Sequence, residues 1–469
     1  MFRRCRLVRG IVERLTKENF TISRLSNGLR VVTADDGGGI TGMGLFTLNG
    51  SKFEDAASAG AAVVFESMPL GGNHLMSGKE VSETLGMFGN AFRVTNNKEA
   101  MSVMLMLPRY HQKDGLELLN AMCLHPTRDL EEFEAAKAKT MQRTALMERD
   151  ASGMCFELVH EAGWDGKGLG NPTNPSPEAL EGLTLEAFTE FYRRCTRPDR
   201  TVLAATGVSD HDAFALLAEQ VFQFDYDDRP FDFPIHPYTG GVRLIQKTEA
   251  PESMLKFQEK NLSHMALFFQ GIPMSHPDYY TVSVIQTLLG GGTSFSSGGP
   301  GKGMHTKLFR EVLNREGGIN GMECITAWYS DGGLIGLYGT APHENAQRLL
   351  KLMIFQAATI PQRVSEEYLE MAKNQLSSQL ILLGESREQM LSDMGFNLLV
   401  QNHVITTQET IRGSAGVTLE NLEEVCAKMI KKPVTFAVYG ETKGMPTQEK
   451  LETSIKKTYV ISNEREADS

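Results

Sequence analysis

The two halves of the sequence repeat the same order of features, and this repetition constrains the fold more than any other property. In each half a short apolar segment leads through a helix-like stretch to a Gly-Gly pair, and the half ends on an apolar run closed by glycine. The matching segments are 45–50 with 267–271, 71–72 with 290–291, and 200–207 with 433–440. Equivalent positions lie between 219 and 233 residues apart. This spacing indicates duplication of a unit of about 220 residues, a feasible domain size, although each match is short and chance agreement is the alternative.

Each half mixes strand-like and helix-like segments without strict alternation. Runs at 30–34 and 43–49 predict strands, whereas the apolar periodicity of 131–149 and 184–194 predicts helices. In the second half, an apolar stripe ending near Leu289 predicts a further helix. This arrangement favours an α+β fold over a doubly wound parallel sheet.

The middle of the chain, from about Asp225 to Glu252, contains four prolines and a Gly-Gly pair flanked by acidic residues, which predicts an inter-domain linker. The predicted organisation is a targeting segment at 1–18, an N-terminal domain at 19–226, a linker at 227–252, a C-terminal domain with a glycine-rich loop at 253–460, and a polar tail at 461–469.

Composition excludes several classes of protein. The formal net charge of −11 disfavours a general nucleic-acid binder, which would be basic. The six cysteines are scattered and form no CxxC pair, so neither a disulfide scaffold nor a zinc ribbon is expected. No apolar run approaches the roughly 20 residues needed to cross a bilayer.

The two ends of the chain differ in character. The first 14 residues carry five arginines interleaved with apolar residues and no acid before Glu13, which is typical of a mitochondrial transit peptide. The alternative is a merely basic terminus. The last residues are polar, and we expect them to be disordered.

The segment Gly290–Gly303 reads GGGTSFSSGGPGKG, in which seven of fourteen residues are glycine. Ordering such a segment costs roughly 1–2 kcal/mol of backbone entropy per residue, and almost no side chain is available to offset this cost. We expect a mobile loop between a helix ending near Leu289 and another starting near Met304. It is not a Walker loop, because Gly301-Lys302 lacks the required spacing and is followed by Gly303. Its Phe295, Pro300 and Lys302 favour a functional loop over a plain linker.

The loop and the helix after it resemble the alpha subunits of mitochondrial processing peptidases, which belong to peptidase family M16. Further segments share the resemblance: SNGLRVV (26–32), LVHEAGW (158–164), RPDRTVLAATGV (197–208) and MAKNQLSSQL (371–380). The resemblance covers about 22–440 and implies two homologous α+β domains. It also implies a heterodimer with a catalytic beta subunit that holds zinc, located in the mitochondrial matrix or on the matrix face of the inner membrane.

Catalytic members of this family hold zinc with an inverted HxxEH motif on a helix, where two imidazoles one turn apart bind the metal and the carboxylate activates water. The corresponding stretch here runs from Val63 to Ser67, so both histidine positions are lost and Glu66 remains. The nearest candidate for a downstream glutamate ligand is Glu148. We therefore expect no catalysis and no zinc on this chain, and we interpret Glu66 as a partnered or half-exposed helix carboxylate.

A subunit that recognises Arg-rich presequences needs carboxylates to pair with guanidinium groups and a surface for the rest of the peptide. The resemblance places acids that contact presequence arginines in the region after the loop, and glycine would let the peptide backbone approach closely. Asp393 follows Ser392 where the family often has two adjacent acids. Each acid taken alone is more often a solvated helix residue. The predicted substrate-binding residues are Gly290, Gly291, Gly292, Ser294, Phe295, Gly298, Gly299, Gly301, Lys302, Gly303, Glu367, Glu370 and Asp393.

Three functions follow from these observations. The first is a non-catalytic, presequence-recognition subunit of a zinc endopeptidase heterodimer. The second is a structural core subunit of respiratory complex III, which shares the fold, and one protein serves both tasks in some lineages. The third is an active peptidase with an unconventional metal site. The intact glycine-rich loop beside a lost HxxEH motif favours the first.

Overall fold

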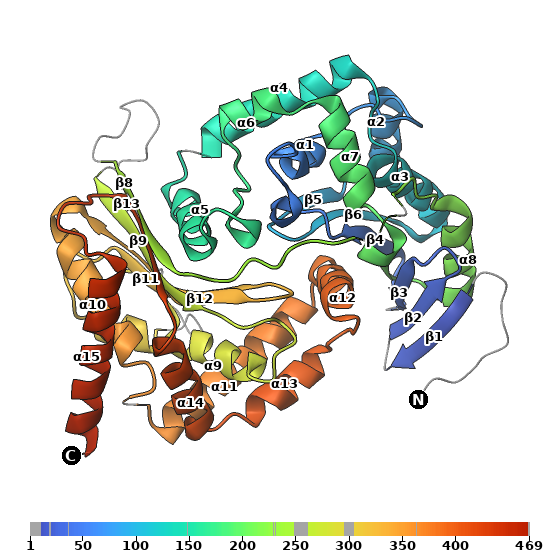
Figure 1. Cartoon of the computed structure of the whole chain (residues 1–469). Helices are drawn as coiled ribbons and strands as arrows, with labels where there is room; N and C mark the ends of the chain where they lie inside the picture. Colours follow the sequence, from blue (N-terminus) through green and yellow to red (C-terminus); the bar gives the residue numbers. More distant parts are fainter. Residues whose placement is uncertain are drawn as a thin grey trace. The chain divides into compact units, whose positions relative to one another are not determined.

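The computed structural model describes residues 11–17, 20–35, 37–147, 149–227, 229, 231–247, 261–294, 304–362 and 364–467. The chain divides into two compact units, each built on one β-sheet covered by helices (Figure 1). Unit 1 draws on Met1–Met147, Asn171–Pro234 and Leu383–Ile405, and unit 2 draws on Glu148–Gly170, Ile235–Leu382 and Thr406–Ser469.

Unit 1 contains a seven-stranded sheet in the order β1-β2-β3-β7-β4-β6-β5. Its only parallel pair among the described strands is β3 with β7. The strands are β1 (Ile11–Lys17), β2 (Phe20–Leu25), β3 (Arg30–Ala34), β4 (Ile40–Thr47), β5 (Phe92–Asn96), β6 (Met101–Pro108) and β7 (Thr201–Thr206).

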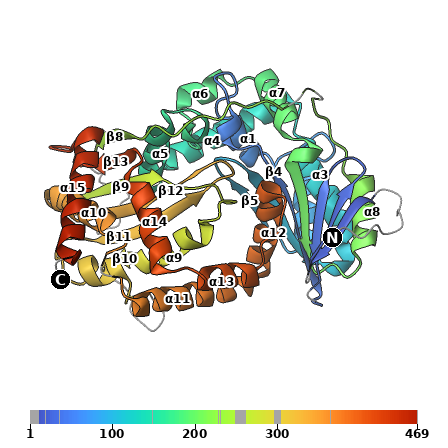
Figure 2. The same ribbon diagram turned by 60° about the horizontal axis from the view of Figure 1, so that its bottom comes forward.

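Unit 2 contains a six-stranded sheet in the order β10-β11-β12-β9-β13-β8, with β10 at one edge (Figure 2). Here the only parallel pair among the described strands is β13 with β8. The strands are β8 (Gly241–Gln246), β9 (Leu262–Gln270), β10 (Gly291–Thr293), β11 (Gly321–Trp328), β12 (Gly333–Pro342) and β13 (Val434–Gly440).

The two sheets have the same topology. The order β3-β7-β4-β6-β5 in unit 1 matches β8-β13-β9-β12-β11 in unit 2, and the parallel pair occupies the same place in both. Leu45 and Leu267, which the sequence pairs, lie on the equivalent strands β4 and β9. The duplication and the α+β class expected from the sequence are therefore confirmed.

Helices cover both faces of each sheet, and side-chain alternation along the strands separates two apolar layers. In unit 1, Leu45 faces the main helical layer, whereas the next residue, Phe46, faces the opposite side. The helices in the first half of the chain are α1 (Ala61–Ser67), α2 (Gly78–Met87), α3 (Gln112–Leu124), α4 (Leu130–Met147), α5 (Ala151–Trp164), α6 (Pro177–Gly182), α7 (Leu185–Cys195) and α8 (His211–Val221).

In unit 2, Leu267 and Phe268 alternate in the same way between two apolar layers. The helices in the second half of the chain are α9 (Tyr279–Leu289), α10 (Ala346–Ala358), α11 (Glu366–Gly384), α12 (Arg387–Gln401), α13 (Thr407–Ala415), α14 (Leu419–Ile430) and α15 (Gln448–Ala467). A short π-helical turn, Phe309–Leu313, follows the glycine-rich segment.

Each unit contains one helix that comes from the opposite half of the sequence. Helix α12 covers β4 and β7 in unit 1, and α5 covers β9, β13 and β8 in unit 2. At Gly395 on α12, an added Cβ would lie only 2.3 Å from the Phe46 ring, so glycine is needed for this close packing. The expected domains, 19–226 and 253–460, are contiguous in sequence and therefore place α5 and α12 in the opposite units.

Three segments differ from the sequence-based expectations. The expected linker, 227–252, contains β8, which pairs with β13 and is therefore part of the sheet. The polar tail is helical as far as Ala467, within α15. Ile11–Lys17, inside the expected targeting segment, forms β1 and pairs with β2, whereas residues 1–10 lie outside the described part of the chain.

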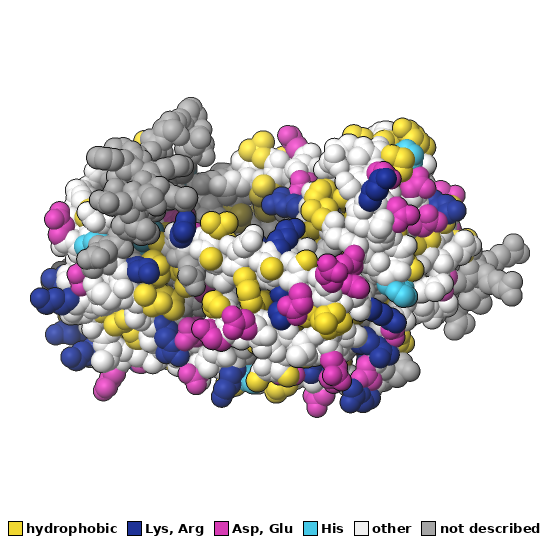
Figure 3. Space-filling model, turned by 90° about the horizontal axis from the view of Figure 1, so that it is seen from above, with side chains coloured by type: hydrophobic (Ala, Val, Ile, Leu, Met, Phe, Trp, Pro, Cys, Tyr) yellow, Lys and Arg dark blue, Asp and Glu magenta, His cyan; other side chains and the backbone are white. Residues whose placement is uncertain are grey.

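The surface of the described residues shows no single dominant character. On the face shown in Figure 3, acidic, basic and hydrophobic side chains are interspersed. None of the described helices has the length and apolar character needed to span a bilayer. The five described cysteines are buried free thiols.

Candidate functional site

Helix α1 carries the stretch from Val63 to Ser67, which the resemblance matches to the HxxEH motif. Its apolar side chains, including Val63, pack into the main core of unit 1, and Val63 is 3% exposed. Glu66 and Ser67 lie on the part of the helix that faces α4. Val63, Glu66 and Ser67 therefore lie on one helix, as expected for this stretch.

Both polar residues of this helix have partners on α4. Glu66 forms a two-point ion pair with Arg143, with nitrogen–oxygen distances of 2.8 and 2.9 Å. The hydroxyl groups of Ser67 and Thr140 are hydrogen-bonded at 2.9 Å, and Thr140 also donates to the carbonyl of Ala136. The interpretation of Glu66 as a partnered helix carboxylate is confirmed.

These residues do not fit a zinc ion. Val63 offers no ligand atom, and the Glu66 carboxylate is held by a guanidinium group that would repel a metal cation. No group of three or more His, Cys, Asp or Glu side chains within the described ranges is placed to hold a metal ion. Glu148, the expected downstream candidate, lies outside the described residues.

A buried carboxyl group positions the start of α1. Glu54 is 7% exposed, and it accepts hydrogen bonds from the backbone N–H groups of Gly60 and Ala62 at 3.0 and 2.8 Å. Burial raises the pKa of Glu54 to about 7, although these two hydrogen bonds oppose the shift. The first turn of α1 is thus fixed by a group that titrates near neutral pH.

The glycine-rich segment begins in a defined conformation. Helix α9 ends at Leu289, as expected, and the next residues form the edge strand β10, which pairs with β11. Gly291 has φ +108°, and a Cβ there would lie 2.1 Å from the carbonyl oxygen of Met322. Only glycine fits this position. The amide of Ser294 continues the pairing by donating to the carbonyl of Asn320 at 2.8 Å.

The segment after the glycine-rich loop is also fixed. The hydroxyl group of Thr306 accepts a hydrogen bond from the N–H of Gly291 at 3.2 Å, so the two ends of the loop are joined. The buried ammonium group of Lys307 donates to backbone carbonyls that follow α10, including that of Gln362 at 3.2 Å. Between these ends, Phe295, Gly298, Gly299, Gly301, Lys302 and Gly303 lie outside the described residues.

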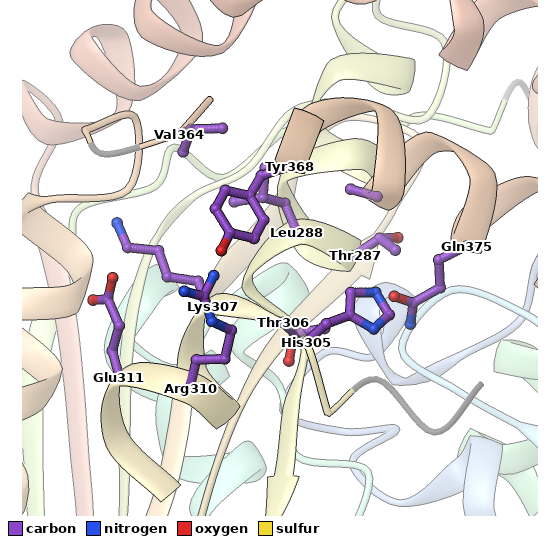
Figure 4. Close-up of a pocket in the computed structure, with 11 residues that line it drawn as sticks. Thr287, Leu288, His305, Thr306, Lys307, Arg310, Glu311, Val364, Tyr368 and Gln375 are labelled. Carbon is purple, nitrogen blue, oxygen red and sulfur yellow. The ribbon is translucent and has the colours of Figure 1, made fainter. Parts of the chain in front are cut away.

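A hollow of about 440 Å³, which includes space open to solvent, lies beside the ends of the loop (Figure 4). We call it the α9–α11 hollow, because its walls come from the end of α9, the segment 305–311 and the first half of α11. The residues that line it include Thr287, His305, Thr306, Arg310, Tyr368 and Gln375. No sequence pattern predicted this hollow.

The predicted acidic residues are divided between the two units. Glu367 and Glu370 are exposed on α11 in unit 2, where Glu370 pairs with Lys373 at 2.7 Å. Asp393 is exposed on α12 in unit 1 and accepts a hydrogen bond from Gln389 at 2.8 Å. Glu367 and Glu370 therefore share a helix with the wall of the hollow, whereas Asp393 belongs to a different unit.

A second internal repeat could have pointed to α11. Glu134 and Lys137 on α4 form an ion pair, and Glu370 and Lys373 on α11 form the matching pair, with both lysine side chains nearly buried. The shared pattern of an apolar residue, glutamate, two further residues and lysine marks α4 and α11 as equivalent helices. It places the α9–α11 hollow of unit 2 where unit 1 has the contact between α1 and α4.

Comparison with known protein families agrees with this architecture. Residues 30–175 match the family described as insulinase (peptidase family M16), and residues 182–376 match the peptidase M16 inactive domain. Together the two matches span most of the chain.

Curated relatives resemble the chain over most of its length. It is 27% identical to the probable mitochondrial-processing peptidase subunit alpha of Schizosaccharomyces pombe, over 90% of this chain and 84% of the relative. It is 26% and 25% identical to the mitochondrial-processing peptidase alpha subunits of Solanum tuberosum and Homo sapiens, over 93% and 92% of this chain and 84% of each relative.

Among solved structures, a chain of complex III2 from Candida albicans shares the fold, with a TM-score of 0.77 over 92% of this chain and 99% of that chain, at 15% identity. The repeated sheet topology agrees with the family matches, and the chain belongs to peptidase family M16.

Proposed function

We propose that this chain is the non-catalytic, presequence-recognition alpha subunit of a mitochondrial processing peptidase, and that it acts with a zinc-holding beta subunit. The observation that carries the proposal is the contrast between two sites. The α1 helix has lost the metal-binding positions and holds Glu66 against Arg143, whereas the glycine-rich loop is anchored at both ends by β10 and Thr306. The curated relatives named as alpha subunits support it.

In this role the chain binds the peptide and its partner cleaves it. Glycine residues allow a peptide backbone to approach without side-chain obstruction. The carboxylates of Glu367 and Glu370, exposed on the helix that lines the hollow, pair with guanidinium groups of the presequence. The partner's zinc supplies the activated water for hydrolysis.

We place the protein in the mitochondrial matrix, or on the matrix face of the inner membrane. The Arg-rich, acid-poor start of the sequence supports import into mitochondria. The mitochondrial names of the relatives support the same location.

The test is co-expression with a partner that carries an intact HxxEH motif, followed by cleavage of a fluorescent presequence peptide by each chain alone and by the pair. We expect cleavage only by the pair. Replacing Gly298, Gly299 and Gly301 with alanine stiffens the loop at constant length, and we expect cleavage to fall by about tenfold or more. The matched control replaces Gly86, Gly182 and Gly317, where an added Cβ meets nothing within 4 Å.

Unchanged cleavage and peptide affinity in the loop variant would refute the recognition role. Chelator-sensitive proteolysis by this chain alone, with stoichiometric zinc bound to it, would instead support the active-peptidase hypothesis.

The alternative function is a core subunit of respiratory complex III, and the fold shared with the Candida albicans complex III2 chain favours it. The two functions are separated by purifying the native protein from mitochondria. Co-purification with c-type haem indicates attachment to complex III, and a haem-free heterodimer indicates a separate peptidase.

A further inference from the structure

The α9–α11 hollow adjoins both ends of the glycine-rich loop. Thr287 lies two residues before the last residue of α9, and His305 and Thr306 belong to the segment that returns from the loop. The third wall is formed by Tyr368 and Gln375 on α11. A peptide bound at the loop could therefore extend into this hollow.

Gln375 on α11 contributes a hydrogen-bond acceptor to one wall. The side-chain carbonyl oxygen of Gln375 is buried and has no hydrogen-bond partner among the described residues. Figure 4 shows this side chain directed toward the space it shares with His305. A buried acceptor without a partner destabilises the folded chain. A ligand that donates a hydrogen bond to it would remove this cost.

Arg310 contributes a hydrogen-bond donor to another wall. The guanidinium group of Arg310 lies over the ring of Tyr368, 4.5 Å from its centroid, and forms no ion pair with any described residue. The neighbouring carboxylate of Glu311 accepts a hydrogen bond from Gln356 at 3.0 Å. This cation–π contact restrains the guanidinium group, and no described residue accepts a hydrogen bond from its N–H groups.

We propose that the α9–α11 hollow binds one peptide group of an extended polypeptide, with Arg310 donating to its carbonyl oxygen and the Gln375 side chain accepting its N–H. This inference rests on the proposed function and assigns the peptide backbone, rather than an arginine side chain, to the hollow. A presequence guanidinium would be repelled by Arg310, whereas a backbone amide offers the matching acceptor and donor whatever the sequence.

The experiment uses the heterodimer with the partner's catalytic glutamate replaced by glutamine, so that the peptide is bound but not cleaved. Binding of a labelled presequence peptide is measured by fluorescence anisotropy. We expect Gln375→Leu to weaken binding roughly threefold to tenfold. The thermal unfolding midpoint should stay equal or rise, because the unpaired acceptor is gone. The matched control is Gln379→Leu, an exposed glutamine one turn along α11, which should leave affinity unchanged.

Peptides with a single N-methyl group, placed at each position in turn, identify the N–H that is bound. One position should lose affinity in the wild type, and that loss should disappear in Gln375→Leu. Arg310→Met should also weaken binding, whereas Arg315→Met, an exposed arginine five residues later, should not.

Wild-type affinity in both Gln375→Leu and Arg310→Met overturns this inference. The proposed function still stands in that case if the loop variant binds weakly. A wild-type heterodimer that binds no presequence peptide overturns both.

Discussion

The α1–α4 contact of unit 1 and the α9–α11 hollow of unit 2 occupy equivalent places in a duplicated fold, but only the first is filled. In unit 1, Glu66 pairs with Arg143 and Ser67 bonds to Thr140. When Lys137 is matched with Lys373, Thr140 corresponds to Leu376 and Arg143 to Gln379, which cannot form these bridges. One copy is thus a closed structural contact, whereas its equivalent is open beside the glycine-rich loop.

The starts of the two helices differ in the same sense. The first turn of α1 is bound by the buried carboxyl group of Glu54, whereas Asp278, at the start of α9, makes no capping hydrogen bond through its side chain. In unit 1, a buried polar side chain therefore holds the start of α1 in place. Substitutions on both sides test this division between a closed and an open site.

The largest effect is expected at the entrance to the open site. Gly291→Ala combines a left-handed φ with a Cβ placed 2.1 Å from the Met322 carbonyl, so β10 must separate from β11. We expect a loss of about 3 kcal/mol or more in stability and loss of peptide binding. Gly292→Ala, at φ +141° but with open space around the Cβ, shows the cost of strain alone and should lose less. Equal effects of the two substitutions would contradict the clash.

The closed site should show a pH signature. Because the folded-state pKa of Glu54 is about 7 and its ordinary value is 4.5, the folded chain binds this proton more tightly than the unfolded chain. Its contribution to the free energy of unfolding therefore falls, by on the order of 3 kcal/mol, as pH rises from about 4.5 to about 7.

Glu54→Gln resembles the neutral acid. Its free energy of unfolding, relative to that of the wild type, should therefore rise by this amount across the same pH range. Urea unfolding at successive pH values measures the difference, and Glu83→Gln on α2, which is exposed, is the control. Parallel curves for the wild type and Glu54→Gln would show that Glu54 does not titrate in this range.

Breaking the ion pair should have a smaller effect. Arg143→Met leaves the Glu66 carboxylate, whose side chain is 16% exposed, without its partner, and we expect a loss of about 1–2 kcal/mol because Arg143 itself is 42% exposed. The double variant Glu66→Gln/Arg143→Met should recover part of the loss. A double-mutant cycle by chemical denaturation measures the coupling, and a coupling near zero would show that the pair is incidental.

The smallest effect is expected from the hydroxyl pair. Thr140→Val removes the partner of Ser67 at a fully buried position, and we expect a loss of about 1 kcal/mol. Peptide binding should be unchanged, because neither Thr140 nor Ser67 is among the residues that line the hollow. Weaker peptide binding in Thr140→Val would show that the two sites do not act independently.

Sequence patterns predicted the elements whose residues are close together along the chain. The strand at 30–34, the end of α9 at Leu289 and the helices at 131–149 and 184–194 agree closely with the structure, because periodicity and glycine placement act locally. The two Gly-Gly pairs 219 residues apart revealed the duplication. The absence of histidine from the stretch 63–67 was visible in the same way.

Contacts between distant segments were not predictable from the sequence. Glu66 and Arg143 are 77 residues apart, and nothing local indicates that α4 brings them together. The short strand β10 looked like the start of a structureless loop, because its glycines gain order only through pairing with β11. The strand β8 was mistaken for a linker, since proline and glycine nearby masked a segment stabilised by β13.

The sequence by itself determined that the chain is a duplicated α+β protein with a glycine-rich segment at 290–303 and no histidine in the stretch 63–67, because these properties depend on residue type and spacing. Only the tertiary structure decided which helix covers which sheet, as with α5 and α12, and which of the two equivalent helix contacts is filled. The physical reason is that packing, ion pairing and burial are set by side chains that meet only when distant parts of the chain fold together.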